Sequence, residues 1–310
     1  MKILITGGSG YVGSLLSAEF LNLGHEVTVV DNLYYDQTSL IPLCYNKNFN
    51  FINGDCRNTS LIRPLIAKND LIIPLACLVG APLCDKDPWA AVAVNRDAIV
   101  DIIGTLSSSQ MLIYPCTNSG YGVGKDSLHC DEKTELNPIS LYGKTKVEAE
   151  KAILDSGKGI SLRLATVFGT SPRMRLDLLV NDFVYRAYYD RYMVLYQAHF
   201  KRNYVHIRDV VAAFVFASKN YNGMKGESFN VGLSEANLSK EELCHKIKQH
   251  IPEFNYFSSE IGEDIDKRNY IVSNEKIEKL GFKAQHSLDD GIKELIKAFK
   301  ILKESQFSNF

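Results

Sequence analysis

The sequence has almost no net charge, no long hydrophobic run and no paired cysteines, and each absence excludes a class of protein. Among its 310 residues, 35 lysines and arginines nearly balance 36 aspartates and glutamates. A net charge of −1 gives no electrostatic footprint for nucleic acid or for an anionic membrane surface, so we expect neither as a partner. The longest uncharged apolar run, residues 71–84, contains two prolines and is shorter than the ~20 residues that span a bilayer.

The seven cysteines form no CxxC pair. An odd and unpatterned set is typical of reduced thiols, and it excludes both a disulfide framework and a zinc site. The N-terminus carries a single early charge, Lys2, and its apolar run breaks at Gly7, which is unlike a signal peptide. We therefore expect a cytoplasmic globular protein, and most readily an enzyme.

The first half of the chain alternates short apolar segments with segments of helical periodicity. Strands are predicted at 2–6, 26–30, 49–53, 70–75, 111–115 and 160–166, and helices at 11–23, 60–68, 89–107 and 141–155. Such alternation predicts βαβ units and a parallel α/β sheet. Because the strands are apolar almost throughout, the sheet is expected to be buried on both faces.

This alternation loosens after residue 169. Helices are predicted at 177–190, 207–219, 239–250 and 287–302, and a strand at 192–196. No linker separates two units. We expect a cofactor lobe at 1–165 and a smaller substrate lobe at 166–310, with the chain crossing between them.

A glycine-rich turn joins the first strand to the first helix. Gly7, Gly10 and Gly13 have the spacing at which glycines permit a tight turn, close approach of a pyrophosphate and close packing of helix on strand. The exposed N–H groups at the start of the helix would then face phosphates. The alternative is an ordinary strand-to-helix turn.

Asp31 ends the second strand, where a carboxylate accepts hydrogen bonds from an adenosine ribose and repels a 2′-phosphate. No arginine follows within twenty residues, so the sequence predicts NAD rather than NADP. Asp55 ends the third strand and could contact the adenine, although a helix-capping role fits nearly as well.

Tyr142 and Lys146 lie four residues apart in the predicted helix 141–155, and therefore on one face. Two other Tyr-x-x-x-Lys matches fall on glycine-interrupted or turn segments. A tyrosine acts as a base near neutral pH only if its pKa falls by about three units, which needs roughly 4 kcal/mol. We expect the Lys146 ammonium and a positive nicotinamide ring to supply it. Thr117, at the end of the preceding strand, could share the proton or could simply form a turn.

Together these motifs resemble the extended short-chain dehydrogenase/reductase family, in its nucleotide-sugar branch. The resemblance covers nearly the whole chain and includes Val94-Asn95 and Arg202-Asn-Tyr-Val-His206. It implies a doubly wound Rossmann sheet that holds NAD and a smaller C-terminal lobe that holds a nucleotide diphospho-sugar. It also implies a homodimer formed through a helix bundle that includes the helix of Tyr142.

The resemblance assigns roles by position. Tyr142 is the base, Thr117 its hydrogen-bonding partner and Lys146 the cation that contacts the ribose. The cofactor-binding residues implied are Gly7, Gly10, Tyr11, Val12, Gly13, Asp31, Asn32, Asp55, Cys56, Leu75, Ala76, Asn95, Tyr142 and Lys146. The substrate-binding residues implied are Thr117, Asn118, Thr166, Arg202 and Arg268, of which the two arginines are expected to clamp the diphosphate.

Two departures from the family pattern narrow the chemistry. Asn118 and Ser119 stand where sugar dehydratases carry an Asp-Glu pair, so dehydration is not expected. Thr166 stands where UDP-galactose 4-epimerases carry an asparagine, which weakens the simple UDP-hexose epimerase interpretation. Oxidation at C4 to a 4-keto sugar is predicted in either of two forms. One is a 4-dehydrogenase, possibly of a GDP-linked sugar such as a heptose, and the other is a 4-epimerase. A non-catalytic NAD-binding regulator is the remote alternative.

Overall fold

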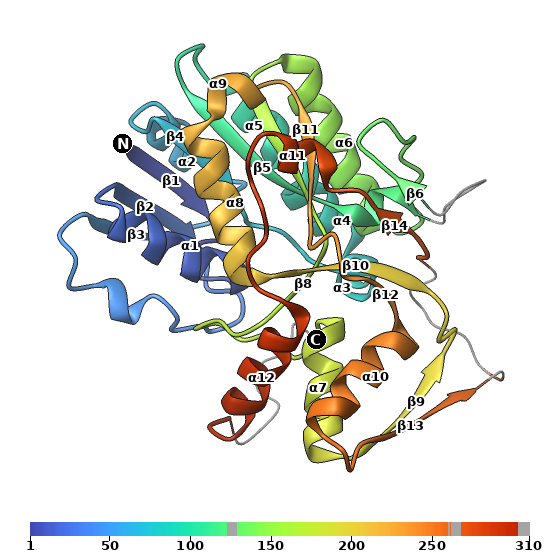
Figure 1. The fold of residues 1–310 in the computed structure, drawn as a ribbon. Helices are drawn as coiled ribbons and strands as arrows, with labels where there is room; N and C mark the ends of the chain where they lie inside the picture. The colour runs from blue at the N-terminus through green and yellow to red at the C-terminus, as the bar shows by residue number, and fades with distance from the viewer. Residues whose placement is uncertain (123–128, 260, 262–267, 303–310) are drawn as a thin grey trace.

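A seven-stranded parallel sheet forms the centre of the molecule (Figure 1). The computed structural model describes residues 1–122, 129–259, 261 and 268–302. Along the sheet the order is β11-β7-β5-β4-β1-β2-β3, and every neighbouring pair is parallel. The strands are β1 (Lys2–Thr6), β2 (Glu26–Asp31), β3 (Phe49–Asn53), β4 (Leu71–Pro74), β5 (Met111–Thr117), β7 (Gly159–Leu164) and β11 (Ser228–Val231). The order reverses at β1 and β4, and ligands of open α/β sheets bind at the carboxyl ends of strands beside such a reversal.

Helices cover both faces of this sheet. In β1, Ile3 and Ile5 pack into one buried cluster with side chains of α1 (Tyr11–Asn22) and α8 (Ile207–Lys219). Leu4 points to the opposite face and packs with α2 (Thr59–Ile66), α5 (Ala98–Thr105) and α6 (Leu141–Ser156). The side chains of Ile3, Leu4 and Ile5 are fully buried. The doubly wound fold expected from the sequence is therefore confirmed.

One predicted helix is not continuous. The segment 89–107 consists of α4 (Pro88–Val92), a π-helical turn at Ala93–Asp97 and then α5. Single π turns within α-helices often occur at functional sites, and this one carries the buried Asn95.

The chain crosses back into the sheet after residue 165. Helix α8 packs on α1, and β11 pairs with β7, so residues 207–231 complete the cofactor lobe. A three-stranded sheet lies between the lobes, with β10 (Lys201–His206) between β8 (Thr166–Phe168) and β12 (Asn237–Ser239). The expected division into lobes at residues 1–165 and 166–310 stays a prediction.

A second hydrophobic core holds the C-terminal lobe together. It lies among α7 (Leu179–Tyr189), α10 (Lys240–His250) and α12 (Leu288–Phe299), next to the strands β9 (Tyr192–Tyr196) and β13 (Asn255–Ser259). The short elements are η1 (Ile41–Leu43), α3 (Ala81–Lys86), η3 (Asn118–Tyr121), β6 (His129–Cys130), α9 (Tyr221–Met224), β14 (Ile271–Val272) and α11 (Glu275–Lys279).

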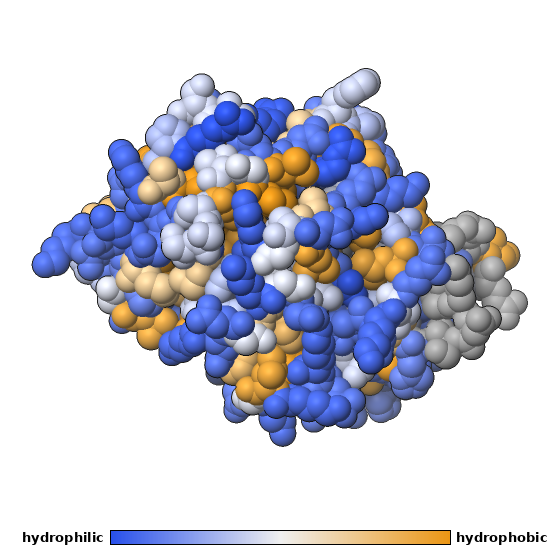
Figure 2. Space-filling model, turned by 90° about the horizontal axis from the view of Figure 1, so that it is seen from above, coloured by the Kyte–Doolittle hydropathy of each residue, from blue (hydrophilic) through white to orange (hydrophobic). Residues whose placement is uncertain are grey.

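The surface carries hydrophobic side chains in areas interrupted by hydrophilic ones, as the face in Figure 2 shows. The most exposed large hydrophobic side chains, such as Trp89 and Tyr45, come from well-separated parts of the chain. Within the described ranges, no helix has the length and apolar character needed to cross a membrane.

Candidate active site

The glycine turn sits at the carboxyl end of β1, against the loop that follows β4. Gly7 has a φ of 72°, and a Cβ there would lie 2.5 Å from the backbone nitrogen of Ala76. A Cβ at Gly13 would lie 2.6 Å from the carbonyl oxygen of Gly7. Side chains are excluded at both positions, as expected of a turn built for close approach of backbone to a ligand.

Asp31 is buried and holds the turn from the side of β2. Its Oδ2 accepts a hydrogen bond from the Ser9 backbone at 2.9 Å, and its Oδ1 accepts one from the Leu33 backbone at 2.8 Å. The Gln37 side-chain amide also donates to Oδ1, at 3.4 Å, so these bonds orient Asp31 and leave a lone pair of Oδ2 for a ribose. The neighbouring Asn32 is exposed, and its side chain accepts from the Tyr34 backbone.

The other expected contacts of the cofactor line the same edge of the sheet. Leu75 donates its backbone N–H to Thr6, which places the start of the β4 loop beside the turn. The Asp55 carboxylate is paired with Arg57 at 2.6 Å, and this hydrogen-bonded pair lowers the pKa of Asp55. Burial raises the pKa of the adjacent Cys56 to about 12, so its thiol is neutral at physiological pH.

Tyr11, the first residue of α1, connects the cofactor lobe to the second lobe. Its hydroxyl donates to the carbonyl oxygen of Gly169 at 2.6 Å, and the Ser171 hydroxyl donates to its carbonyl oxygen at 2.6 Å. The Asn181 amide lies 3.3 Å from the same hydroxyl. Burial raises the pKa of Tyr11 well above its usual range, so the hydroxyl remains a donor. Val12 follows it, half-buried, in the first turn.

Tyr142 and Lys146 occupy successive turns of α6. Ser140 caps the helix by accepting from the Gly143 backbone, which sets where the helix begins and hence which way both side chains face. The Lys146 side chain is almost fully buried, and its Nζ lies 4.0 Å from the centre of the Tyr114 ring. Among the described residues its ammonium has no hydrogen-bond acceptor.

A buried ammonium without an acceptor is costly, so Lys146 is suited to a ligand that brings one. A ribose hydroxyl of a dinucleotide would meet this need, and the glycine turn offers room for its pyrophosphate. The residues present thus fit NAD on two independent observations, the orphaned ammonium and the side-chain-free turn.

The surroundings of Tyr142 act on its pKa in both directions. Burial raises the pKa of Tyr142 above its usual range, and the guanidinium groups of Arg175 and Arg268 act in the opposite direction. The lowering of this pKa expected from Lys146 and a nicotinamide ring stays a prediction.

Thr117 ends β5 and is tied to the residue two positions further on. Its hydroxyl donates to the Ser119 hydroxyl at 2.9 Å, and the Ser119 backbone donates back at 3.1 Å. The Arg268 guanidinium donates to the same Ser119 hydroxyl. Arg268 thus lies at Thr117 and Tyr142, and its expected contact with a diphosphate stays a prediction.

Asn118 follows Thr117 and is enclosed by protein. Its side chain is 1% exposed, and neither amide atom finds a hydrogen-bond partner among the described residues. The expected contact of Asn118 with substrate stays a prediction. Ser119, expected only as part of the departure from the dehydratase pattern, bonds to Thr117.

The Asn95 side chain forms hydrogen bonds with the loop after β4. Its amide exchanges two hydrogen bonds with the Leu78 backbone, at 2.9 and 3.0 Å, and lies 3.4 Å from the Thr145 hydroxyl. It thereby connects the cofactor edge of the sheet with α6. The expected contact of Asn95 with the cofactor stays a prediction.

The remaining expected substrate residues lie at the junction of the lobes. Thr166 begins β8 and is half-buried. Arg202 lies in β10, almost fully buried, 5.7 Å from the centre of the Tyr270 ring. Arg175, which the sequence marked only as part of a loop expected near the sugar or base, is paired with Asp177 and close to Tyr142.

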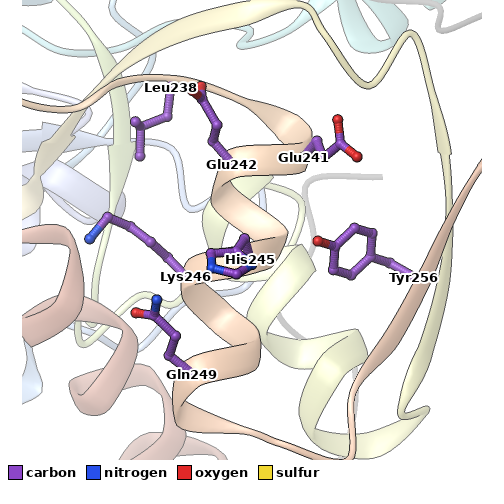
Figure 3. A pocket seen from close by; sticks show the side chains of 7 residues that line it. All are labelled: Leu238, Glu241, Glu242, His245, Lys246, Gln249 and Tyr256. Atoms are coloured by element: carbon purple, nitrogen blue, oxygen red, sulfur yellow. The ribbon is translucent and has the colours of Figure 1, made fainter.

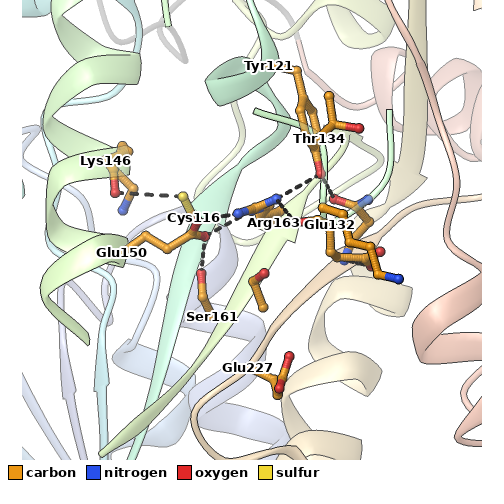
Figure 4. Close-up of polar contacts among 12 residues, drawn as sticks. Cys116, Tyr121, Glu132, Thr134, Lys146, Glu150, Ser161, Arg163 and Glu227 are labelled. Carbon is orange, nitrogen blue, oxygen red and sulfur yellow. Dashed lines mark hydrogen bonds and ion pairs between the residues drawn. The ribbon is translucent and has the colours of Figure 1, made fainter. Parts of the chain in front are cut away.

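A buried polar network supports α6 one turn beyond Lys146 (Figure 4). Glu150 accepts a bond from Arg163 at 2.7 Å and from the Ser161 hydroxyl at 2.5 Å. Arg163 also donates to the Tyr121 hydroxyl at 3.0 Å, which donates to Asn230 at 2.8 Å. The network joins α6, β7, β11 and the segment after Thr117. The sequence signalled none of it, because the hydrogen-bonded partners are 11 to 109 positions apart.

A separate pocket of about 520 Å³ lies against α10 on the C-terminal lobe (Figure 3). Its polar lining includes Lys246, which is already paired with Asp289 at 2.9 Å. No residue of the glycine turn or of α6 reaches it. We therefore place the candidate active site at the sheet edge between Gly7, Thr117 and Tyr142.

The chain is similar in sequence to enzymes whose names refer to UDP-linked sugars. Over 99% of the chain, it is 27% identical to UDP-glucuronic acid decarboxylase 1 of Arabidopsis thaliana, 72% of which is covered. Over 80% of the chain, it is 26% identical to UDP-glucose 4-epimerase of Lactobacillus helveticus, 82% of which is covered.

A solved structure of UDP-glucuronic acid 4-epimerase from Bacillus cereus, in complex with UDP-glucuronic acid and NAD, superposes with a TM-score of 0.84 at 24% identity. It covers 98% of this chain and 100% of that one, and the likeness shows the shared fold. The model of the NAD dependent epimerase/dehydratase family matches residues 3–232. This confirms the expected nucleotide-sugar branch and NAD as the cofactor: the chain belongs to the NAD dependent epimerase/dehydratase family.

Proposed function

We propose that the protein oxidises the C4 hydroxyl of a nucleotide-activated sugar to a 4-keto sugar. The observation that carries this proposal is the packing of α6 on β5 next to Thr117: the Lys146 carbonyl oxygen lies 3.4 Å from the Tyr114 hydroxyl and 3.7 Å from the Cys116 thiol. Tyr142 and Lys146 come from one face of α6, and Thr117 comes from the end of the neighbouring β5.

In this arrangement the phenolate of Tyr142 accepts the proton of the C4 hydroxyl. NAD, when bound, supplies the acceptor for the hydride that leaves C4 and a positive ring that favours the phenolate. Arg175 and Arg268 already act in that direction against the effect of burial. Because Tyr142 takes the proton of the C4 hydroxyl, the remaining lone pair of the Thr117 oxygen accepts a hydrogen bond from a different hydroxyl of the sugar. Lys146 holds a ribose hydroxyl.

A second candidate, 4-epimerisation, is favoured by the contacts of Tyr11. The bonds from Tyr11 to Gly169 and from Ser171 to Tyr11 close the second lobe over the start of α1. A dinucleotide that leaves the turn would have to part them, which supports a retained cofactor. A retained cofactor suits a keto sugar that turns over in the site and is reduced on its other face. If the keto sugar leaves instead, the net reaction is that of a 4-dehydrogenase.

Incubation with a panel of UDP-, GDP-, CDP- and dTDP-linked sugars tests both forms. The panel includes UDP-hexoses, UDP-glucuronic acid and a GDP-linked heptose. Absorbance of NADH and product mass are followed together. Isomerisation at unchanged mass indicates the epimerase, loss of two hydrogens indicates the dehydrogenase, and release of carbon dioxide indicates the chemistry named for the decarboxylase relatives. If no sugar is isomerised, loses carbon dioxide or reduces NAD, the proposal is overturned.

A further inference from the structure

Residues 169–175, named the strap, run from the end of β8 past the start of α1. The Gly169 carbonyl oxygen accepts a hydrogen bond from the Tyr11 hydroxyl, and the Ser171 hydroxyl donates to the Tyr11 carbonyl oxygen. The Ser171 hydroxyl also lies 3.0 Å from the hydroxyl of Ser14, nearly one turn further along the helix. Because the N–H groups at the start of α1 are those expected to face a pyrophosphate, the strap borders the place of that group.

The other end of the strap reaches the loop that follows β2. The Arg173 guanidinium lies 4.9 Å from the centre of the Tyr35 ring. Tyr35 is joined to Asp31 through Gln37, whose side chain accepts from the Tyr35 backbone at 3.0 Å and donates to Asp31 at 3.4 Å. Since Asp31 is the expected partner of the adenosine ribose, the strap extends from the place of the pyrophosphate toward that of the adenosine.

Two side chains of the C-terminal lobe bind the strap to that lobe. Asn181 of α7 is fully buried, accepts from the Gly169 backbone at 3.0 Å and donates to the Arg175 carbonyl oxygen at 2.8 Å. Glu294 of α12 accepts from the Thr170 backbone at 2.8 Å and also from the Thr170 hydroxyl. Both helices belong to the second hydrophobic core. The strap is therefore bonded to both lobes.

Glu294 is the charged contact of the strap with the C-terminal lobe. Its second carboxylate oxygen lies 3.3 Å from Nε2 of His206. The Nδ1 of His206 accepts from the Arg208 backbone, so in the neutral ring Nε2 carries the proton and faces Glu294. A Cβ at Gly169 would lie 2.5 Å from the same Nε2, so the strap passes directly against this ring. An ionised acceptor makes a stronger hydrogen bond than a neutral one, and Glu294 therefore holds Thr170 more firmly than an amide would.

We propose that the strap closes over bound NAD and that Glu294 is its latch, so that NAD leaves only after the bonds from Thr170 to Glu294 have parted. Glu294 acts through Thr170 and the strap, which makes it a positioning residue for the cofactor. The proposed role concerns release of NAD and applies whichever sugar is the substrate. It therefore goes beyond the C4 chemistry proposed above and does not depend on it.

Exchange of bound NAD tests the latch without any sugar. Full-length protein that holds NAD is mixed with an excess of radiolabelled NAD, and the label bound to protein after rapid gel filtration is followed in time. Glu294→Ala removes the acceptor of the latch. Tyr11→Phe removes the bond from α1 to the strap and retains the aromatic ring.

The matched control is Asp209→Asn, which weakens the attachment of the same helix at its other end. Asp209 accepts from the Gln285 and His286 backbones, each at 2.9 Å, just before α12 begins. Within the described part of the chain it bonds no residue of the strap. A general loosening of α12 would therefore appear in this variant as well, whereas loss of the latch would not.

Glu294→Ala is expected to speed exchange about 10- to 10²-fold, the range by which a hydrogen bond to a charged group contributes. Tyr11→Phe removes a bond between neutral groups and is expected to speed exchange about 3- to 10-fold. Asp209→Asn should exchange NAD at the wild-type rate. Thr170→Val is expected to speed exchange in the wild type but to add nothing to Glu294→Ala, because the two residues act as one contact.

The proposal is overturned if Glu294→Ala exchanges NAD at the wild-type rate, or if Asp209→Asn speeds exchange as much as Glu294→Ala. It is also overturned if Thr170→Val speeds exchange further in the Glu294→Ala background. Thermal melting and NAD content check that each variant folds. Should Glu294→Ala fail to fold or to hold NAD, Thr170→Val alone replaces it, and a wild-type exchange rate then overturns the proposal. Because no sugar takes part, failure of the proposed C4 chemistry in the sugar panel leaves this result unaffected.

Discussion

Lys146 and Glu150 lie one turn apart on α6 and are almost equally buried. Among the described residues, however, only the charge of Glu150 has hydrogen-bond partners. Lys146 is 3% exposed and Glu150 is 1% exposed. Glu150 accepts hydrogen bonds from Arg163 and Ser161 on β7. The ammonium of Lys146 lies over an aromatic ring and has no hydrogen-bond acceptor among the described residues.

This difference distinguishes a supporting charge from a reactive one. A buried charge with all its partners present stabilises the fold and has no capacity left for a ligand. A buried charge without an acceptor costs stability, and it persists where a ligand completes it. Tyr142 follows the same pattern, since its hydroxyl has no hydrogen bond within the described part of the chain. At the reactive end of α6, Tyr142 and Lys146 therefore lack hydrogen-bond partners among the described residues. At the supporting end, Glu150 has its partners.

Replacing Lys146, whose ammonium has no acceptor among the described residues, has the largest expected effect on the rate of NADH formation. Lys146→Met is expected to slow NADH formation about 10³-fold, in the range by which acid–base groups contribute. Its free energy of unfolding should stay the same or rise, because an uncompensated buried ammonium is removed. Stopped-flow absorbance and urea unfolding of the same preparation measure both. A variant that unfolds more easily and retains its rate would reverse the assignment.

Replacing Glu150 is expected to lower stability strongly and to change the rate of NADH formation little. Glu150→Gln leaves Arg163 buried without its counter-charge, so the free energy of unfolding is expected to fall by about 3–5 kcal/mol. The double variant Glu150→Leu with Arg163→Met should recover most of the loss. At a temperature where the variants are folded, the rate of NADH formation should change much less than in Lys146→Met. Urea unfolding that shows no loss for Glu150→Gln would contradict a supporting role.

A half-buried carboxylate, Glu294, extends the comparison to pH. Burial alone would raise the pKa of Glu294, but His206 at 3.3 Å and hydrogen bonds from Thr170 lower it to about 2. A carboxylate whose pKa is lower in the folded state stabilises the fold above its unfolded value, near 4.5, and loses that contribution as the pH falls toward 2.

The free-energy difference between wild type and Glu294→Gln should therefore be constant from pH 7 to about 5 and shrink below about 4.5. Urea unfolding at a series of pH values measures it. A difference that grows toward acid pH would show that Glu294 is protonated in the folded state.

Strong local patterns predicted the cofactor lobe well. The strand Tyr192–Tyr196 and the helix Ile207–Lys219 lie at their predicted bounds, because their apolar periodicity ends sharply. Strand β11 was missed, since four residues give too short a pattern to separate a strand from a loop. The π turn at Ala93–Asp97 was also missed, because it depends on the hydrogen bonds of Asn95 with a distant loop.

The features of the candidate site also fall into those that local sequence patterns predict and those that depend on the packing of distant segments. The positions of Gly7, Asp31 and Tyr142 follow from elements that are local in sequence, so their place at the sheet edge could be predicted. The contact of Arg268 with Ser119 and the raised pKa of Tyr142 could not, because both depend on how distant segments pack.

The central claim is that the phenolic oxygen of Tyr142 is the base at C4, and Tyr142→Phe tests it most directly. The variant removes that oxygen and retains the ring, so NAD content and thermal stability should match the wild type. Single-turnover NADH formation with the sugar that the panel identifies is expected to fall at least about 10³-fold. A variant that holds NAD and forms NADH within about tenfold of the wild-type rate would contradict the account.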